Sequence, residues 1–253
     1  MLTQVIGLGV VGKAQAFLLN SLGYKVYGYD VEKVPKNDYY ETVEQPVKAD
    51  VTFICVPEKL VDQAVKQLVD AGNNWLVVKS TTPPGTVAEL AGKYGVHLCH
   101  NPEFLRKKRA FDDVLSPSRI VIGQCCPKHG SVLIDIYRRI NAPIYVADTT
   151  TSEMVKIVSN ALRAFNITFW NNVFSLAQAL SIDVQDVVDL ADPVKVLGEW
   201  EGGKWGTKLF GKPYDGKCLP KDMNILAEAL KSRGLDASVI DAMQNYNEKL
   251  KRR

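Results

Sequence analysis

With 253 residues, the chain is long enough to bury a hydrophobic core, either in one large domain or in two smaller ones. Its 46% of hydrophobic and 23% of charged residues are typical of a globular protein and exclude an intrinsically disordered one. The net charge of +3 argues against a nucleic-acid partner, because such proteins gather basic residues on one surface. No apolar run approaches the roughly 18 residues that cross a bilayer, so we expect no membrane partner.

The cysteines predict a reducing compartment. The chain contains five of them, an odd number, and none belongs to a C-x-x-C pair. Because the sequence also shows no signal-peptide pattern, we expect a cytoplasmic protein with unpaired thiols. We expect the adjacent Cys125 and Cys126 to be structural, and we expect no metal site.

Strands and helices alternate in the first part of the chain. We expect strands at residues 2–6, 24–29, 51–56, 75–79, 96–99, 119–122 and 144–146. We expect helices at residues 13–22, 60–70, 87–94 and 131–140, and one short helix within the polar residues 33–48. This alternation is typical of an α/β fold with a doubly wound, Rossmann-like and mostly parallel sheet, which we assign to residues 1–148.

A glycine-rich turn follows the first expected strand. Gly7, Gly9 and Gly12 form a G-x-G-x-x-G pattern before the first helix. The first glycine permits a tight turn, the second lets a pyrophosphate approach the backbone, and the third allows the helix to pack closely on the strand. Asp30, at the end of the second strand, would accept hydrogen bonds from ribose hydroxyls and repel a 2′-phosphate. The pattern therefore predicts binding of NAD rather than NADP.

Two further strands are followed by candidate functional residues. A hydroxyl-rich turn that includes Thr81 and Thr82 lies at the carboxyl end of the expected strand 75–79. Ligands of open α/β sheets bind at this edge; the alternative is that the threonines cap the next helix. Glu103 follows a proline after the expected strand 96–99 and is a candidate general base. The alternative is that Glu103 compensates the dipole in the first turn of a helix.

The alternation stops near residue 148, where a long helix follows. The polar residues 148–152 are expected to cap a helix at 153–179, which is longer than most globular helices and suggests a spine between domains or subunits. Glu153, Lys156 and Asn160 share one face of it. An ion pair is the simplest explanation of the first two, whereas an amide among apolar residues needs hydrogen-bond partners. Residues 149–253 therefore form a second, helical domain, with shorter helices at 184–190, 223–231 and 237–251.

Cys218 lies in the segment Tyr214-Asp215-Gly216-Lys217-Cys218-Leu219-Pro220-Lys221-Asp222. Pro220 suits the first position of a helix, whose positive dipole end favours a thiolate just before it. Asp222 lies four residues on and is expected to project from the same side as the thiol. Cys218 is thus a candidate nucleophile; the alternative is a small, buried apolar residue at a helix start. The loop at 200–214 that leads to it is long enough to be functional.

Together these motifs resemble the UDP-glucose/GDP-mannose dehydrogenase family. The matching pieces occur in the family's order and cover nearly the whole chain, and their combination is more specific than any one of them. They are Gly7-Leu8-Gly9-Val10-Val11-Gly12, Cys55-Val56-Pro57, Lys79-Ser80-Thr81, Asn101-Pro102-Glu103-Phe104-Leu105, Ser116-Pro117-Ser118-Arg119, the helix with Glu153, Lys156 and Asn160, and Gly216-Lys217-Cys218-Leu219-Pro220-Lys221-Asp222.

The resemblance implies a two-step oxidation of a sugar primary alcohol to a carboxylate, with NAD as the oxidant. It implies that Cys218 attacks the aldehyde-level carbon and carries a thiohemiacetal and then a thioester, which water cleaves. Lys156 and Asn160 would stabilise negative charge on the substrate oxygen, and Asp222 would position or activate water. Thr81 and Glu103 would assist proton transfer. The expected NAD site comprises Gly7, Gly9, Val10, Val11, Gly12, Asp30, Lys33, Val56, Pro57, Ser80 and Thr81.

The chain also departs from the family's pattern. Members usually have a third domain that helps to hold the nucleotide of the substrate, and we expect this chain to lack it. A second glutamate of the family is replaced by Lys107, and the usual Asp-Pro-Arg reads Asp192-Pro193-Val194-Lys195. We therefore expect a nucleotide sugar or another sugar as the substrate. Because the family pairs its subunits through the long helix, we expect a homodimer through residues 153–179.

Three functions are open at this point. The first is an NAD-dependent sugar 6-dehydrogenase in a compact form. The second is a single-step 3-hydroxyacid dehydrogenase, which shares the architecture and a catalytic lysine but leaves Cys218 structural. The third is an NAD-binding protein that is not an enzyme on its own and depends on a partner. The Cys-Leu-Pro-Lys-Asp stretch at residues 218–222 favours the first.

Overall fold

The computed structural model describes residues 1–32, 34–35, 37–191 and 212–252. The chain divides into two units, Met1–Lys156 and Ile157–Arg253, and each has a hydrophobic core of its own. The sequence-based boundary at 148/149 is the point where the long helix begins, whereas the boundary between the units falls within that helix. Residues 192–195 and most of the loop at 200–214 lie outside the described residues.

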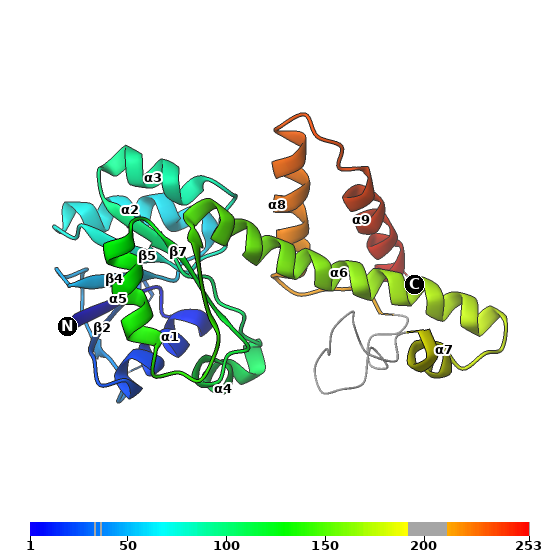
Figure 1. Ribbon diagram of the computed structural model, residues 1–253, viewed down its shortest axis with the longest axis horizontal. Coiled ribbons are helices and arrows are strands. Elements are labelled where there is room, and N and C mark those ends of the chain that lie inside the picture. Colours follow the sequence, from blue (N-terminus) through cyan, green and yellow to red (C-terminus); the bar gives the residue numbers. More distant parts are fainter. Residues whose placement is uncertain (33, 36, 192–211, 253) are drawn as a thin grey trace. The chain divides into compact units, whose positions relative to one another are not determined.

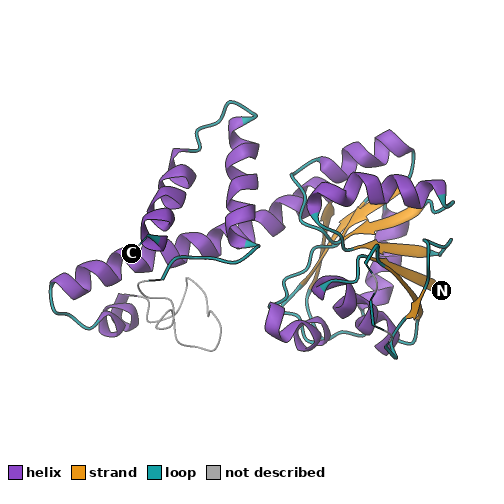
Figure 2. Ribbon diagram, turned by 180° about the vertical axis from the view of Figure 1, so that it is seen from behind, coloured by secondary structure: helices purple, strands orange, loops and turns teal. Residues whose placement is uncertain are grey.

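One sheet forms the centre of the first unit (Figure 2). In the described part of the chain it has eight strands, in the order β3-β2-β1-β4-β5-β6-β7-β8. Every neighbouring pair is parallel except β6 and β7. The strands are β1 (Leu2–Ile6), β2 (Lys25–Tyr29), β3 (Glu41–Thr42), β4 (Val51–Ile54), β5 (Trp75–Val78), β6 (His97–His100), β7 (Ile120–Gln124) and β8 (Ile144–Asp148). The prediction of a doubly wound, mostly parallel sheet is confirmed.

Helices cover both faces of this sheet (Figure 1). Helices α1 (Val10–Ser21), α4 (Ala110–Leu115) and α5 (Pro127–Tyr137) pack on one face, in the same apolar cluster as Phe53 and Ile122. On the other face, α2 (Val61–Asp70) and α3 (Thr86–Tyr94) share a cluster with Ile54 and Leu76. Every residue of β4 and β5 is buried, which explains why these strands read as continuous apolar runs without alternation.

The second unit is helical. It contains most of α6 (Thr149–Ala179), together with α7 (Val184–Ala191), α8 (Leu219–Lys231) and α9 (Ser238–Lys251). Asp148 caps α6, because its carboxylate accepts hydrogen bonds from the backbone N–H of Thr151 at 2.9 Å and from its hydroxyl at 2.6 Å. The core of this unit gathers residues of α6, α8, α9 and the segment before α8: Ala161, Ala164, Ile167, Tyr214, Met223 and Met243.

A few local predictions were wrong. The short helix α4 was not expected, because six residues carry too little periodicity to reveal a helix. No helix occurs among the described residues 34–35 and 37–48, where the exposed strand β3 pairs with β2 instead. Helix α8 begins at Leu219, so Pro220 occupies its second position rather than its first. None of the helices in the described ranges combines the length and the hydropathy that crossing a bilayer requires.

Candidate active site

The glycine turn between β1 and α1 has the geometry that its pattern predicts. Gly7 adopts a φ of +84°, and a Cβ there would lie 2.8 Å from the carbonyl oxygen of Cys55. A Cβ on Gly12 would lie 1.8 Å from the carbonyl oxygen of Gly7, so only glycine allows α1 to approach the turn this closely. A Cβ on Gly9 would meet no atom within 4 Å, which leaves open space in front of the first turn of α1.

Asp30 lies beside this turn and helps to fix it. Its Oδ2 accepts a hydrogen bond from the backbone N–H of Leu8 at 2.6 Å, and its Oδ1 accepts one from Glu32 at 3.0 Å. Each carboxylate oxygen has a further lone pair, so Asp30 retains the capacity to bind hydroxyl groups. Lys33, the other residue expected near this position, lies outside the described residues.

The carboxyl ends of β4 and β5 are tied together by Ser80. Its hydroxyl donates a 2.6 Å hydrogen bond to the carbonyl oxygen of Val56. Val10 and Pro57 are exposed, Val11 and Val56 are partly buried, and Thr81 is buried. These residues follow parallel strands at the same sheet edge as the glycine turn, which is where open α/β sheets bind their ligands.

Glu153 holds the turn after β5, which contradicts its expected pairing with Lys156. The Glu153 side chain is fully buried and accepts hydrogen bonds from the hydroxyl of Thr82 at 2.8 Å and from the backbone N–H groups of Gly85 and Val87 at 2.7 and 2.9 Å. Burial raises the pKa of Glu153, and these three donors oppose that shift. The alternative that Thr81 and Thr82 cap α3 is wrong, since the N-cap of that helix is Gly85 and has no side-chain hydrogen bond.

Lys156 pairs with Glu103 instead. Its Nζ lies 3.0 Å from Glu103 Oε1 and donates a 2.7 Å hydrogen bond to the Glu103 carbonyl oxygen. The ammonium is also 5.5 Å from the centroid of the Phe104 ring. Glu103 lies in the loop after β6 and not in the first turn of a helix, so the dipole explanation is wrong. The structure therefore brings a buried cation and a candidate base into direct contact.

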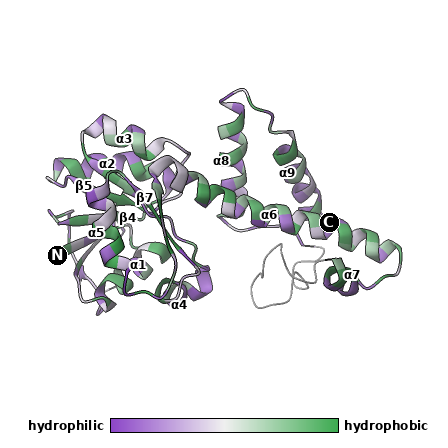
Figure 3. Ribbon diagram, in the orientation of Figure 1, coloured by the Kyte–Doolittle hydropathy of each residue, from purple (hydrophilic) through white to green (hydrophobic). Residues whose placement is uncertain are grey.

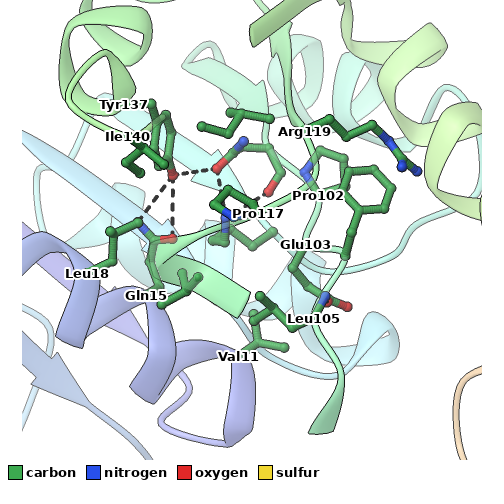
Figure 4. A pocket seen from close by; sticks show the side chains of 15 residues that line it. Val11, Gln15, Leu18, Pro102, Glu103, Leu105, Pro117, Arg119, Tyr137 and Ile140 are labelled. Atoms are coloured by element: carbon green, nitrogen blue, oxygen red, sulfur yellow. Dashed lines mark hydrogen bonds between the residues drawn. The ribbon is translucent and has the colours of Figure 1, made fainter. Parts of the chain in front are cut away.

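A second buried lysine, which sequence reasoning did not single out, lies near Glu103. Lys79 Nζ donates a 2.7 Å hydrogen bond to Asn101 Oδ1, which also accepts one from the hydroxyl of Tyr137 at 2.5 Å. Burial lowers the pKa of Lys79 to about 8 and raises that of Tyr137. Gln15 and Tyr137 point toward one another in the pocket that these residues line with Glu103 (Figure 4). The Lys-Ser-Thr pattern and the motif that begins at Asn101 were the sequence signals for this network, and nothing in the sequence pointed to Tyr137.

His100 is another residue that the sequence did not reveal. It is fully buried at the end of β6, with Nδ1 2.8 Å from the Ser152 hydroxyl and Nε2 3.3 Å from the Ser80 carbonyl oxygen. Burial lowers its pKa to about 3, so the imidazole is neutral. His100 therefore connects the hydroxyl-rich turn to the first turns of α6.

In the second unit, Cys218 is exposed at the N-cap of α8, which contradicts the alternative of a small buried residue. The backbone N–H of Asp222 donates a 2.9 Å hydrogen bond to the Cys218 carbonyl oxygen, in the first turn of that helix. The Asp222 side chain is fully buried and accepts a short hydrogen bond from Asn160 Nδ2. Lys221 Nζ lies 3.2 Å from Asp222 Oδ1, as an ion pair without hydrogen-bond alignment. The amide of Asn160 thus has the partner that its position requires.

The geometry defines a class of protein. The first unit combines a Rossmann-like sheet, a glycine turn at a helix start and an acid at the end of β2, which is the arrangement of a dinucleotide-binding domain. The second unit adds an exposed thiol at the N-cap of α8, one helical turn before the carboxylate that the Asn160 amide contacts. Such a combination is typical of a dinucleotide-dependent oxidoreductase.

Comparisons with known proteins identify the family. Residues 35–141 match the NAD binding domain, and residues 150–249 the central domain, of the UDP-glucose/GDP-mannose dehydrogenase family. The chain belongs to this family. The recognised family, the fold, the NAD cofactor and the enzyme class expected from the sequence are confirmed.

Relatives and solved structures agree. A GDP-mannose 6-dehydrogenase of Pseudomonas savastanoi pv. phaseolicola is 26% identical over 98% of this chain and 68% of its own length. A UDP-glucose 6-dehydrogenase of Bacillus subtilis is 29% identical over 80% of this chain and 43% of its own length. The structure of a UDP-glucose dehydrogenase from Pyrobaculum islandicum has a TM-score of 0.83 and 28% identity, and covers 98% of this chain and 68% of that one.

Proposed function

We propose that this chain catalyses the NAD-dependent oxidation of the primary alcohol of a nucleotide-linked sugar to a carboxylate, in two successive hydride transfers. The observation that carries the proposal is the start of α8, where the exposed thiol of Cys218 precedes the buried Asn160–Asp222 pair. The relatives' names, GDP-mannose 6-dehydrogenase and UDP-glucose 6-dehydrogenase, support a sugar nucleotide as the substrate.

The residues at the end of β1 fit the dinucleotide. The first turn of α1 carries no acidic residue, and Gly9 at its N-cap leaves the backbone N–H groups open to a pyrophosphate. NAD, when bound by these residues, would supply the acceptor for the hydride that is released in each oxidation. The residues proposed to hold it, in addition to Lys33, are Gly7, Gly9, Val10, Val11, Gly12, Asp30, Val56, Pro57, Ser80 and Thr81.

The remaining side chains have roles that follow from their chemistry. Cys218 Sγ attacks the aldehyde carbon while the aldehyde oxygen takes up a proton, and the resulting thiohemiacetal loses a hydride and its hydroxyl proton to become a thioester. Lys156 and Asn160 donate hydrogen bonds to the substrate oxygen as negative charge develops on it. Glu103, held by Lys156, accepts the proton of the alcohol with the help of Thr81. Asp222 orients the water that cleaves the thioester and releases the thiol.

The test is the yield of NADH per sugar in Cys218→Ser. We expect the unmodified chain to form two NADH per molecule of UDP- or GDP-sugar, and the variant to lose the second oxidation. Glu228→Gln, a change of an exposed residue on the same helix, is the matched control and should keep the full yield. One NADH per substrate, unchanged in Cys218→Ala, would support the single-step dehydrogenase instead. Binding of NAD without binding of any UDP- or GDP-sugar would support a partner-dependent protein.

We also propose that the chain forms a homodimer through α6. Hydrophobic residues recur along this helix (Figure 3), and several remain exposed, with Leu162 at 56% and Leu176 at 62%. Val158, Leu162, Phe165, Phe169 and Leu176 follow at intervals of four, three, four and seven residues, which keeps them on one helical stripe.

Light scattering coupled to size exclusion tests the dimer. We expect the unmodified chain to elute at the mass of two chains and Leu162→Glu/Leu176→Glu at the mass of one, because a charge in an apolar interface stays unpaired. Gln178→Glu, which places the same charge at an exposed polar position of α6, should remain dimeric. A monomeric unmodified chain at micromolar concentration would contradict the proposal.

We further propose a reducing compartment, the cytoplasm, as the location of the chain. All five cysteines are free in the structure. A thiol that must act as a nucleophile, as proposed for Cys218, also requires reducing conditions.

A further inference from the structure

Four side chains gather at the sheet edge opposite the glycine turn. They are His97, Cys125, Cys126 and His129, and their nitrogen and sulfur atoms all lie within 4.8 Å of one another. Nδ1 of His129 lies 3.2 Å from the sulfur of Cys126 and 3.5 Å from that of Cys125. None of these residues takes part in the proposed oxidation.

The topology explains how residues far apart in the sequence meet here. His97 begins β6, and Cys125 and Cys126 directly follow β7. Because β6 and β7 are antiparallel, with His100 opposite Gly123, the start of β6 lies next to the end of β7. Helix α5 begins right after Cys126, so His129 lies in its first turn and faces back toward the sulfurs.

The side chain of His129 is held in place from one side. Trp75, which is paired with His97 in the sheet, stacks on the His129 ring with centroids 4.6 Å apart and an interplanar angle of 26°. The His97 ring lies 4.4 Å from the same imidazole. His129 is buried, the two sulfurs are partly buried, and His97 is exposed, so the cluster is open to solvent at one point.

The ligand types in this cluster favour a zinc ion. Two thiols and two imidazoles form the Cys₂His₂ set that Zn²⁺ prefers in closed, tetrahedral sites. In such a site, Zn–S distances of about 2.3 Å and Zn–N distances of about 2.0–2.1 Å place the ligand atoms about 3.3–3.8 Å apart. The two sulfur–nitrogen distances at His129 are close to these values, and the widest separation of 4.8 Å needs a shift of only about 1 Å.

We propose that His97, Cys125, Cys126 and His129 bind one structural Zn²⁺ ion, which ties the start of β6 to the turn between β7 and α5. This differs from the expectation of no metal site, because the sequence shows only Cys-Cys-x-x-His and leaves His97 far away. The ion would stabilise the one antiparallel pair seen among the described strands. It lies at the edge where β6 begins, away from the edge where the dinucleotide is proposed to bind.

A disulfide bond at Cys125 would compete with zinc binding. Cys99 Sγ lies 3.3 Å from Cys125 Sγ but is not a member of the four-residue cluster. A Cys99–Cys125 disulfide would remove Cys125 as a ligand, so zinc binding and this bond exclude each other. The full chain, purified with a phosphine reductant and stripped of metal, is therefore titrated with Zn²⁺ against a chromogenic chelator and, separately, with Co²⁺.

We expect one Zn²⁺ per chain, with a dissociation constant below the micromolar range, and a Co²⁺ spectrum with a thiolate charge-transfer band. His97→Ala and Cys126→Ser should each weaken Zn²⁺ binding by about 100-fold or more, because even changes behind the ligands cost roughly 10–100-fold. His97 is exposed, so its variant should fold. Zn²⁺ should also raise the melting temperature of the unmodified chain but not that of His97→Ala.

Two control variants make the result decisive. Cys218→Ser, which changes an exposed thiol in the other unit, and Cys99→Ala should both bind Zn²⁺ as tightly as the unmodified chain. The proposal is overturned if the unmodified chain binds Zn²⁺ no more tightly than His97→Ala, or if the Co²⁺ spectrum lacks the thiolate band. A Cys99–Cys125 disulfide in the reduced protein would overturn it as well.

Discussion

Replacing Glu153 by alanine is expected to destabilise the first unit by about 3 kcal/mol or more. The carboxylate is fully buried and accepts three hydrogen bonds, from the Thr82 hydroxyl and from the backbone of Gly85 and Val87. Alanine leaves these donors without a partner, and an unsatisfied buried donor costs about 1–3 kcal/mol. Thr82 and Val87 are buried and Gly85 is partly buried, so the first two dominate the loss.

The free energy of unfolding is obtained from urea denaturation followed by circular dichroism. Glu153→Gln keeps one acceptor oxygen and should lose less than the alanine variant. The control Glu89→Ala changes an exposed carboxylate on α3 and should stay within about 0.5 kcal/mol of the unmodified chain. A loss below about 1 kcal/mol in Glu153→Ala would refute the reasoning, because the three donors would then have found other partners.

Two further predictions concern other buried polar groups. Burial lowers the pKa of Lys79 from 10.5 to about 8, so between these values the unfolded state holds more protons and the free energy of unfolding rises with pH. Urea titrations across this pH range should show the free energy of unfolding rising with pH in the unmodified chain and rising less in Lys79→Met. Equal slopes in the two proteins would contradict the prediction. Asn160→Ala should destabilise the helical unit by about 3 kcal/mol, because the buried Asp222 carboxylate loses its amide donor. Asn160→Ala/Asp222→Asn should recover part of that loss in the same denaturation assay, and no recovery would count against the pairing.

The parts of the site that a single short segment builds could be predicted from the sequence. Gly7 and Gly12 are close enough in the chain that their spacing alone fixes the turn and the approach of α1. The same holds for the place of Cys218 at the start of a helix, one turn before Asp222; that the two side chains project from the same side stays a prediction. Local rules of backbone geometry decide these positions, and the sequence displays them directly.

The partners of the charged residues could not be predicted in this way. Glu153 and Lys156 are neighbours on one helix face, yet their partners lie 71 and 53 residues away, in the loops after β5 and β6. The fold offers Glu153 three donors at the turn after β5 and offers Lys156 a carboxylate, and these outcompete a pair along the helix surface. The contact between His97 and His129 could not be predicted for the same reason, because it depends on the antiparallel register of β6 and β7.

The residue that follows Asn101 in the chain protects its amide against deamidation. It accepts from Lys79 and Tyr137 and donates to the carbonyl oxygen of Val121 at 2.7 Å, so conversion to an acid would break the last of these bonds. Asparagine deamidates when the backbone nitrogen of the next residue attacks the side-chain amide carbon. The next residue here is Pro102, whose nitrogen carries no hydrogen and cannot react in this way. The network is thus built on an asparagine that resists spontaneous deamidation throughout the life of the protein.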